Sequence, residues 1–353
     1  MEKRTRKLLS FTLAGFALPA IASAIIISTI NYKMTGPERL IAHRGWSAKY
    51  FQNTYAAFNG AVGGTESKFW GAEVDLQMDS ENKIWCSHYI NPFEDVTKKI
   101  DELTTVGIQN EYLKTDGALN PYKINVPRDS FNDQLCPFYD PSNNVGYLNC
   151  FLNNNAHPII ELKIESVLQD DPIDDCMKID QDKVTTFITN ILKDIQTAST
   201  SDASLLSRCY FVSFSDDLLA ETIRQVHEDT YSQVSNKQFQ KLLDDGGNGA
   251  YILSDTYKNT TPGSKTGSTT NVKNYEKYVD GSWNQDGNEP IGIDVYYGLL
   301  TSKMINKAHQ NNVEANCWTA NYTRTEIAEA MSLNILAKSG CDLITTDDWF
   351  NLK

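Results

Sequence analysis

From Leu40 onward, the chain of 353 residues alternates between short apolar runs and longer amphipathic stretches, and this alternation limits the possible folds more than any other feature. Several of the runs are continuously apolar, which is typical of strands that are buried on both faces. We predict nine such strands. They are Leu40–His43, Gly71–Leu76, Lys83–His88, Pro158–Ile164, Tyr210–Phe214, Ala250–Leu253, Ile291–Tyr296, Val313–Trp318 and Cys341–Thr345.

The amphipathic stretches between these runs predict helices. Lys183–Ile195 repeats its apolar residues at close to 3.6 residues, and Leu218–Val226, Leu299–Gln310 and Arg324–Lys338 have similar patterns. Strands that alternate with helices indicate an α/β fold with a parallel sheet. Eight or nine strands over this length favour a closed (β/α)8 barrel, the TIM barrel, over an open sheet, although periodicity alone is compatible with both.

Two polar stretches interrupt this rhythm. Residues 93–149 are rich in Asn and Asp, and residues 259–290 are rich in Gly, Thr, Asn and Ser. Long stretches of this composition are typical of loops rather than of a folded core. We therefore expect one barrel domain over residues 36–353, with both stretches as insertions above the barrel.

Residues 1–35 predict a basic flank followed by a transmembrane helix. Four basic residues among the first seven precede the uncharged run Leu8–Ile30, which as a helix would span about 34 Å, enough to cross a bilayer. A basic flank stays in the cytoplasm, so we expect a single-pass protein of the cell membrane whose catalytic domain is extracytoplasmic. The alternative is a cleaved signal peptide and a secreted protein, because Ala22-Ser23-Ala24 resembles a cleavage site. The apolar run continues beyond that site, which favours the uncleaved anchor.

The formal net charge of −13 limits the partners of the protein. An acidic surface repels nucleic acid, which we exclude as a main partner. The same charge gives no long-range attraction for a phosphate substrate, so a phosphate site would need a positive field made locally by a metal ion, Arg or Lys. The seven cysteines form no CxxC pair, and their odd number argues against a complete disulfide framework.

Two carboxylates share one face of a predicted strand. Side chains alternate along a strand, so Glu73 and Asp75 in Gly71–Leu76 point to the same side. Two acids side by side repel each other unless a cation lies between them. The predicted strand Pro158–Ile164 adds a third acid, Glu161. Oxygen ligands of this kind suit a hard divalent cation.

Imidazole and cationic side chains also lie at the ends of predicted strands. His43 and Arg44 end the first strand, His88 ends the third, and Lys163 lies two residues after Glu161. In a barrel the carboxyl ends of the strands converge on one face, where catalysis takes place. Together with the three acids, these residues supply what phosphate-ester chemistry needs: metal ligands, acid–base groups and cations for phosphate oxygens.

In this arrangement the sequence resembles the glycerophosphodiester phosphodiesterase family from about Leu40 to Trp349. The order and the spacing of several motifs agree with the family pattern. They are His43-Arg44-Gly45, Gln52-Asn53-Thr54, Ala57-Phe58, Glu73-Val74-Asp75, His88, Glu161-Leu162-Lys163, Trp318-Thr319-Ala320-Asn321 and the stretch from Gly340 to Asp347. The resemblance implies a TIM barrel that hydrolyses glycerophosphodiesters to glycerol 3-phosphate and an alcohol, as part of lipid and glycerol metabolism.

The resemblance also implies a role for eight residues. Glu73, Asp75 and Glu161 bind a divalent cation, Mg²⁺ or Ca²⁺; His43 and His88 form the acid–base pair; Arg44 and Lys163 bind phosphate oxygens; and Trp318 lines the substrate pocket. The partners expected from it are a small glycerophosphodiester or a lipid headgroup, with the membrane as a partner of the amino-terminal helix.

Two departures from the family pattern keep other functions open. Gln52 replaces a Glu, and Tyr89 replaces the Asp that follows the second His. These changes favour a catalytically impaired surface protein that binds ligands on the same barrel. A third alternative is a phospholipase D-type enzyme that acts on intact lipids, which the predicted membrane anchor favours.

Overall fold

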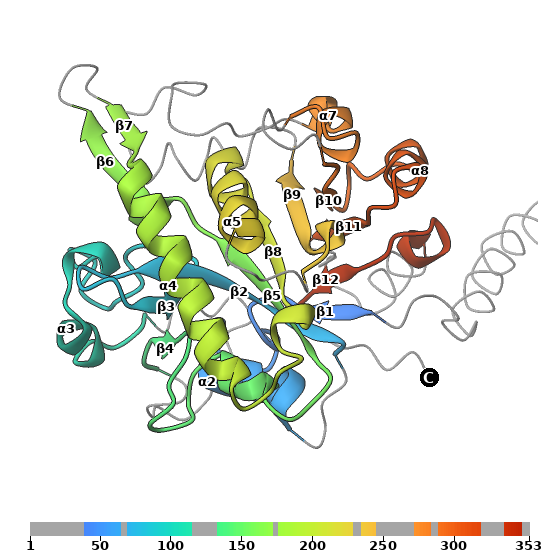
Figure 1. Cartoon of the computed structure of the whole chain (residues 1–353). Coiled ribbons are helices and arrows are strands. Elements are labelled where there is room, and N and C mark those ends of the chain that lie inside the picture. Colours follow the sequence, from blue (N-terminus) through green and yellow to red (C-terminus); the bar gives the residue numbers. More distant parts are fainter. Residues whose placement is uncertain are drawn as a thin grey trace, which may run out of the picture.

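The computed structural model describes residues 39–64, 69–114, 133–171, 176–228, 234–244, 272–283, 289–318 and 335–347. Within them, eight parallel strands close into a barrel (Figure 1) because β1 pairs with both β12 and β2. This confirms the predicted α/β barrel. In order around the ring the strands are β1 (Leu40–Ala42), β2 (Gly71–Met78), β5 (His157–Leu162), β8 (Tyr210–Ser213), β9 (Phe239–Leu243), β10 (Gly292–Tyr296), β11 (Ala315–Trp318) and β12 (Ile344–Thr346).

Helices connect successive barrel strands and cover the outside of the ring. In the part of the chain that the structure describes, the labelled α-helices are α2 (Tyr55–Phe58), α3 (Thr105–Gln109), α4 (Gln181–Ser199), α5 (Asp216–Glu228), α7 (Glu276–Val279) and α8 (Ser302–Gln310). A π-helical turn, η1 (Asn59–Gly63), continues α2. The short 3-10 turns are η2 (Ile100–Glu102), η3 (Leu148–Phe151), η4 (Glu165–Val167), η5 (Leu206–Arg208), η6 (Asn236–Gln238) and η7 (Val272–Asn274). Helix α4 begins at an N-cap, Asp180, whose carboxylate accepts from the amides of Asp182 and Lys183.

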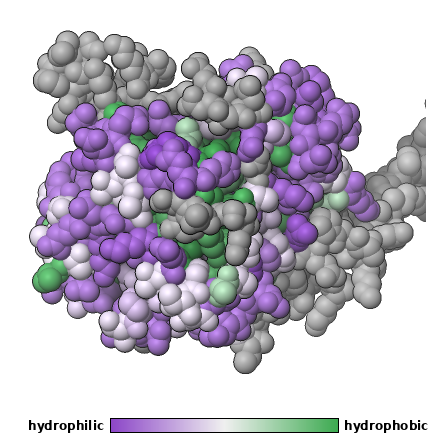
Figure 2. Space-filling model, viewed as in Figure 1, coloured by the Kyte–Doolittle hydropathy of each residue, from purple (hydrophilic) through white to green (hydrophobic). Residues whose placement is uncertain are grey.

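The barrel has two apolar layers. Residues on the outer faces of the strands pack under α4, α5 and α8 in the main core. Inside the ring a second cluster contains Ile41, Ile159, Tyr210, Val212, Leu242 and Leu343. Figure 2 shows hydrophilic residues over most of the face that bears α4 and α5, with apolar residues gathered toward its middle. The predicted period of Lys183–Ile195 is confirmed, because the apolar residues of α4 are buried along one side.

Strand β2 changes partners along its length. Its first residues pair with β1 and β5, and Leu76–Met78 pair antiparallel with β3 (Ile84–Cys86), which pairs in turn with β4 (Cys136–Pro137). Asp79 stabilises the turn, because its Oδ1 accepts from the amides of Glu81 and Lys83 at 2.9 and 2.8 Å. The predicted strand Lys83–His88 therefore exists but is not a parallel strand of the barrel. An apolar run does not distinguish the two orientations.

The strand β9 was missed by the sequence analysis. Its sequence, Phe239 to Leu243, contains Gln240 and Lys241, which weaken the apolar signal. Both side chains are buried with partners: Gln240 donates to the carbonyl of Lys237 at 3.1 Å, and Lys241 lies 2.8 Å from Asp216. The strand predicted at Ala250–Leu253 lies outside the described residues, and the ring is complete without it.

Parts of other predictions also lie outside the described residues. These are the membrane segment Leu8–Ile30, residues 115–132 and most of 259–290, and the start of the helix Arg324–Lys338, of which 335–338 are helical. Among the residues that the structure describes, no helix combines the length and the apolar character needed to cross a bilayer. An antiparallel hairpin, β6 (Leu168–Asp171) and β7 (Cys176–Ile179), precedes α4.

The stretch that follows β4 packs on the outside of the barrel. Tyr147 is fully buried there, and its hydroxyl donates to the carbonyl of Ala72 at 2.7 Å and accepts from the amide of Ile159 at 3.0 Å. Since Ala72 lies on β2 and Ile159 on β5, this tyrosine joins the edges of the two strands. This contact holds β2 and β5 together just before Glu73 on the first strand and Glu161 on the second.

Candidate active site

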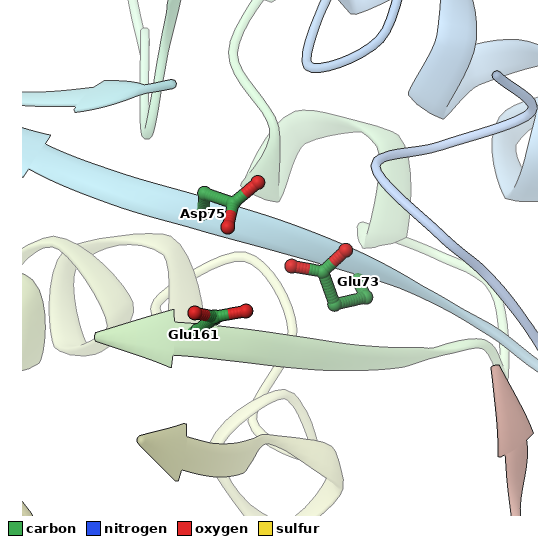
Figure 3. Close-up of side chains that lie close together, drawn as sticks. All are labelled: Glu73, Asp75 and Glu161. Atoms are coloured by element: carbon green, nitrogen blue, oxygen red, sulfur yellow. The ribbon is translucent and has the colours of Figure 1, made fainter. Parts of the chain in front are cut away.

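Three carboxylates meet inside the barrel on two neighbouring strands. Glu73 and Asp75 lie on β2, and Glu161 lies on β5, opposite Asp75 in the hydrogen-bond register. One oxygen from each lies within 4.8 Å of the others, and Figure 3 shows the three side chains pointing toward one another. The alternation that put Glu73 and Asp75 on one face of a strand therefore brings them together with Glu161.

The environment treats these three acids differently. Burial, together with the charges of Asp75 and Glu161, raises the pKa of Glu73 well above its usual value. Burial also raises the pKa of Glu161 to about 7, although Lys163 opposes this. Burial alone would raise the pKa of Asp75 too, but the positive charges of Arg44 and Lys163 hold it below its usual range. Asp75 is thus the ionised centre of the cluster.

The cluster contains oxygens that the described protein leaves without hydrogen bonds. Glu73 Oε1 and Asp75 Oδ1 are buried and accept no hydrogen bond within the described residues. A buried carboxylate oxygen without a partner is costly unless a cation or a donor compensates it. Carboxylate oxygens on rigid strands are the ligands that Mg²⁺ and Ca²⁺ prefer. The donor set therefore fits a divalent cation.

Arg44 and Lys163 surround the acids with positive charge. The backbone amide of Arg44 donates to Glu73 Oε2 at 2.8 Å, and its Nε lies 3.1 Å from Asp75 Oδ2. Lys163 Nζ lies 2.9 Å from Glu161 Oε1 and 3.5 Å from Asp75 Oδ1. Arg44 takes a left-handed φ of 57°, and Gly45 follows at 77°, where a Cβ would lie 2.6 Å from the backbone of Ala57. This tight turn aims both the amide and the guanidinium of Arg44 at the acids.

The two histidines reach the site by different routes. His43 follows β1, and its Nδ1 lies 2.6 Å from Oδ1 of Asp347, which follows β12. His88 follows β3, and the amide of Ser87 beside it donates to the carbonyl of Asp75 at 2.8 Å. Burial, with the charges of Arg44 and Lys163, holds the pKa of His88 well below its usual range. The antiparallel hairpin therefore returns His88 to the acids on β2.

A sequence model of the glycerophosphoryl diester phosphodiesterase family matches residues 43–349. The chain belongs to this family. The predicted family is thereby confirmed, as is the prediction that the chain is an enzyme of this class. No curated protein sequence matches the chain at a significant level.

Solved structures with the same fold include several that carry the family name. One, from Silicibacter pomeroyi, is assigned as a glycerophosphoryl diester phosphodiesterase. It aligns with a TM-score of 0.59 and 16% sequence identity, and the alignment covers 89% of this chain and 91% of the Silicibacter chain. A glycerophosphodiester phosphodiesterase of Parabacteroides distasonis has a TM-score of 0.51 and 18% identity over 88% and 92%. A phosphodiesterase of Oleispira antarctica in complex with sn-glycerol-3-phosphate has a TM-score of 0.52 and 11% identity over 88% and 92%. At these identities the likeness shows the fold.

The two departures from the pattern of the glycerophosphoryl diester phosphodiesterase family have clear local roles. Gln52 Oε1 accepts from Arg44 Nη1 at 2.9 Å, so the neutral side chain still holds the guanidinium in place. Tyr89 packs its ring edge-on against His88, with 4.6 Å between the ring centres. Neither substitution removes a member of the acidic cluster.

Trp318 lies on a different part of the ring from the charged residues. It ends β11 and packs edge to face with Phe214 at 5.4 Å and with Tyr296 at 5.5 Å. Its indole Nε1 donates to the backbone carbonyl of Asp294 at 3.2 Å. Trp318 is thus part of an aromatic group formed by β8, β10 and β11.

Two residues of the site were not assigned roles by the sequence analysis. Asn53 Nδ2 donates to Asp75 Oδ2 at 2.9 Å, and Asp347 accepts from Ser47 Oγ at 2.9 Å as well as contacting His43. Both lie within motifs that carried the family resemblance, Gln52-Asn53-Thr54 and the last strand. Those motifs were the signal that could have identified them.

Proposed function

We propose that the protein hydrolyses glycerophosphodiesters to glycerol 3-phosphate and an alcohol with the help of a divalent cation, Mg²⁺ or Ca²⁺. The observation that carries the proposal is the cluster of three carboxylates within 4.8 Å of one another, flanked by Arg44 and Lys163. This combination of metal ligands and cations suits the hydrolysis of a phosphodiester. Family membership and the product complex of the Oleispira phosphodiesterase support the choice of substrate.

Each group of residues has a distinct role in this proposal. Glu73, Asp75 and Glu161 would hold the cation, which when bound supplies positive charge that stabilises the phosphoryl oxygens in the transition state. Arg44 and Lys163 bind and orient the phosphate. His43 and His88 exchange protons: one takes the proton of the attacking water, and the other gives a proton to the leaving alcohol.

Asp347 and Asn53 position two of these groups. The contact between Nδ1 of His43 and Asp347 holds the imidazole ring in one orientation, which supports the role of His43 in proton exchange at the site. Asn53 fixes one carboxylate oxygen of Asp75, and the other accepts no hydrogen bond within the described residues, although Lys163 Nζ lies 3.5 Å from it. Such supporting hydrogen bonds hold reacting groups in place before the substrate binds.

Release of glycerol 3-phosphate from a panel of glycerophosphodiesters, with and without EDTA, tests this function. We expect turnover that chelation abolishes and that added Mg²⁺ or Ca²⁺ restores. The matched control is the variant with both His43→Ala and His88→Ala, which exposes any contaminating hydrolase. Full activity of metal-stripped protein in excess chelator would overturn the metal assignment, and no turnover of any diester with metal present would favour the ligand-binding alternative.

The same panel separates a phospholipase D-type activity from the proposed one. The predicted membrane anchor favours intact lipids as substrates, so phospholipid vesicles belong in the assay. Headgroup release from vesicles at a rate similar to that from glycerophosphodiesters would favour the phospholipase. We expect the water-soluble diesters to be preferred because the acidic cluster lies inside the barrel.

We also propose that Leu8–Ile30 anchors the chain in the cell membrane with the barrel outside the cytoplasm. The length of this run and the basic residues before it support this orientation. Protease added to intact cells should then digest the barrel domain. Protection equal to that of a cytosolic marker would contradict the orientation, and release of a shortened chain into the medium would identify a cleaved signal peptide.

A further inference from the structure

Asp294 is a buried acid inside the barrel to which the proposed mechanism gives no role. It lies in the middle of β10, paired in register with Leu242 of β9 and Asn316 of β11. Leu242 belongs to the cluster inside the ring, and paired residues of neighbouring strands point to the same face. The side chain of Asp294 therefore points into the barrel. In the ring of eight strands β10 stands four strands from β2, on the opposite wall.

Within the described residues, one oxygen of the buried Asp294 carboxyl is left without a hydrogen bond. The residue is 5% exposed, and this oxygen is its Oδ1. Its polar neighbour Asn316 is satisfied, because it accepts from the amide of Leu343 at 3.0 Å and donates to Gln240. An unpartnered buried carboxyl destabilises the fold, so its presence requires another explanation. A ligand that enters the site is such an explanation.

Asp294 belongs to the same site as the acidic cluster without being part of it. The carboxylates within 4.8 Å of one another are Glu73, Asp75 and Glu161, and Asp294 is not among them. Asp294 and Glu161 nevertheless both face the inside of the barrel, and burial together with the negative charge of Glu161 raises the pKa of Asp294 well above its usual value. The elevated pKa favours the protonated form, which can both donate and accept a hydrogen bond.

The surroundings of Asp294 suit an uncharged polar group. Trp318 donates its indole N–H to the Asp294 backbone carbonyl and packs with Phe214 and Tyr296. Sites for small molecules commonly combine aromatic walls with a few polar groups that fix orientation. The aromatic rings offer a surface for C–H groups, and Asp294 is the buried polar side chain beside them.

We propose that Asp294 binds a free hydroxyl group on the glycerol arm of the substrate, so that the enzyme selects diesters in which the arm that keeps the phosphate carries hydroxyls. This inference rests on the proposed function. A phosphate held by β2 and β5 leaves one arm of the diester to extend across the barrel toward β10. A site that buries a polar group for a substrate hydroxyl rejects analogues that lack it, because the group is then left unpaired.

The test compares two substrates that differ only in these hydroxyls, glycerophosphocholine and propyl phosphocholine, on the full chain with Mg²⁺. We expect the wild-type protein to favour the glycerol diester in kcat/KM by about a hundredfold or more. Asp294→Leu should bring the ratio close to one by losing activity on the glycerol diester alone, and Asp294→Asn should retain part of the preference. The matched control is Asp194→Asn on α4, which should leave the ratio unchanged.

A binding measurement keeps this inference separate from the proposed function. Calorimetry with glycerol 3-phosphate and propyl phosphate should give a wild-type preference for the first that Asp294→Leu removes, whether or not any diester is hydrolysed. Absence of turnover would contradict the function, and the binding preference would then decide the role of Asp294. An unchanged preference in Asp294→Leu would overturn the inference. A second control replaces choline with ethanol in both substrates. If the loss of kcat/KM in Asp294→Leu then disappears, the residue acts on the choline group, and the inference is overturned.

Discussion

Across the inside of the barrel, the wall formed by β2 and β5 is a network of ion pairs, whereas β8, β10 and β11 form an aromatic wall with one buried acid. On the first wall Asp75 lies within 3.5 Å of both Arg44 and Lys163, and Glu161 lies 2.9 Å from Lys163. On the second, Asp294 stands beside Trp318 with an oxygen that has no partner among the described residues.

This contrast separates two tasks. The charges of the first wall are arranged by one another, so the positive and negative groups are in position before a substrate arrives. In our proposal, the acid of the second wall gains a partner when a ligand binds. We therefore expect changes on the first wall to affect turnover and changes on the second to affect the choice and the affinity of the substrate.

The largest effect should follow from breaking the centre of the charged wall. Asp75→Asn removes the ionised member of the acidic cluster, and we expect kcat/KM to fall by about a thousandfold or more, since metal-ion stabilisation of a transition state is worth several kcal/mol. Calorimetry with Mg²⁺ should show weaker binding. Circular dichroism should be unchanged, because the amide keeps the shape of the buried side chain. Activity within tenfold of wild type would show that this wall does not hold the metal.

The next largest effect should come from the two histidines beside this wall, His43 after β1 and His88 after β3. His43→Ala and His88→Ala should each lower kcat by about a hundredfold or more, the usual scale for general acid–base groups. The double variant should lose much less than the product of the two losses, because residues that act as a unit are not additive. Tyr89→Asp, which restores the family residue beside His88, should keep or raise the activity. Near wild-type turnover in both single variants would contradict the acid–base pair.

A smaller effect should follow on the aromatic wall. Trp318→Leu removes the ring that packs with Phe214 and Tyr296, and we expect KM to rise by about tenfold while kcat stays within about threefold. Uniform loss of ground-state and transition-state binding has this signature. Steady-state kinetics on the best glycerophosphodiester measures both constants. A fall in kcat as large as that of the histidine variants would contradict the idea that the aromatic wall affects substrate binding rather than turnover.

The smallest effect concerns the amino-terminal end of the strands, away from both functional walls. The ring of His157, at the start of β5, stacks on Trp70 with 3.5 Å between the ring centres, and burial lowers the pKa of His157 to about 4. The folded state thus binds this proton less tightly than the unfolded state does. This contribution to stability is present above pH 6.5 and is lost as the pH falls through the window from 6.5 to 4.

His157→Gln should therefore flatten the dependence of Tm on pH between 4 and 6.5. After allowance for the partial exposure of the ring, the contribution is about 1–2 kcal/mol, or a few degrees in Tm. Thermal unfolding at several pH values measures it, and the difference in Tm at pH 8 reports the packing lost with the ring. An unchanged slope would mean that the acid sensitivity arises in the ion pairs of the charged wall.

The charged wall could be predicted from the sequence because its residues follow local rules. Alternation puts Glu73 and Asp75 on one face, and neighbouring strands of a parallel sheet bring Glu161 beside them. The orientation of β3 could not be predicted, since an apolar run does not encode the direction of its neighbour. Strand β9 could not be predicted because Gln240 and Lys241 interrupt its apolar run, and the groups that pair with these two side chains are known only from the folded structure.

The aromatic wall is harder to predict for a different reason. The strand that carries Asp294 was predicted, but a single acid in an apolar run gives no sign of the face on which it lies. Its register with Leu242 and Asn316 decides that it points inward, and register is a property of the assembled sheet. One oxygen of its carboxyl has no partner among the described residues, and this too is visible only when all eight strands are in place.

The hydrogen bond between His43 and Asp347 joins residues separated by 304 positions, because β1 and β12 close the ring. Contacts between distant parts of a chain form slowly during folding. Closing a long loop lowers the conformational entropy before the new contacts contribute favourable free energy. His43 therefore gains its orienting carboxylate late, and refolding followed in parallel by circular dichroism and by activity should show activity returning last. A chain still emerging from the ribosome carries Glu73, Asp75 and Glu161 but has no oriented His43. We therefore expect no activity until β12 pairs with β1.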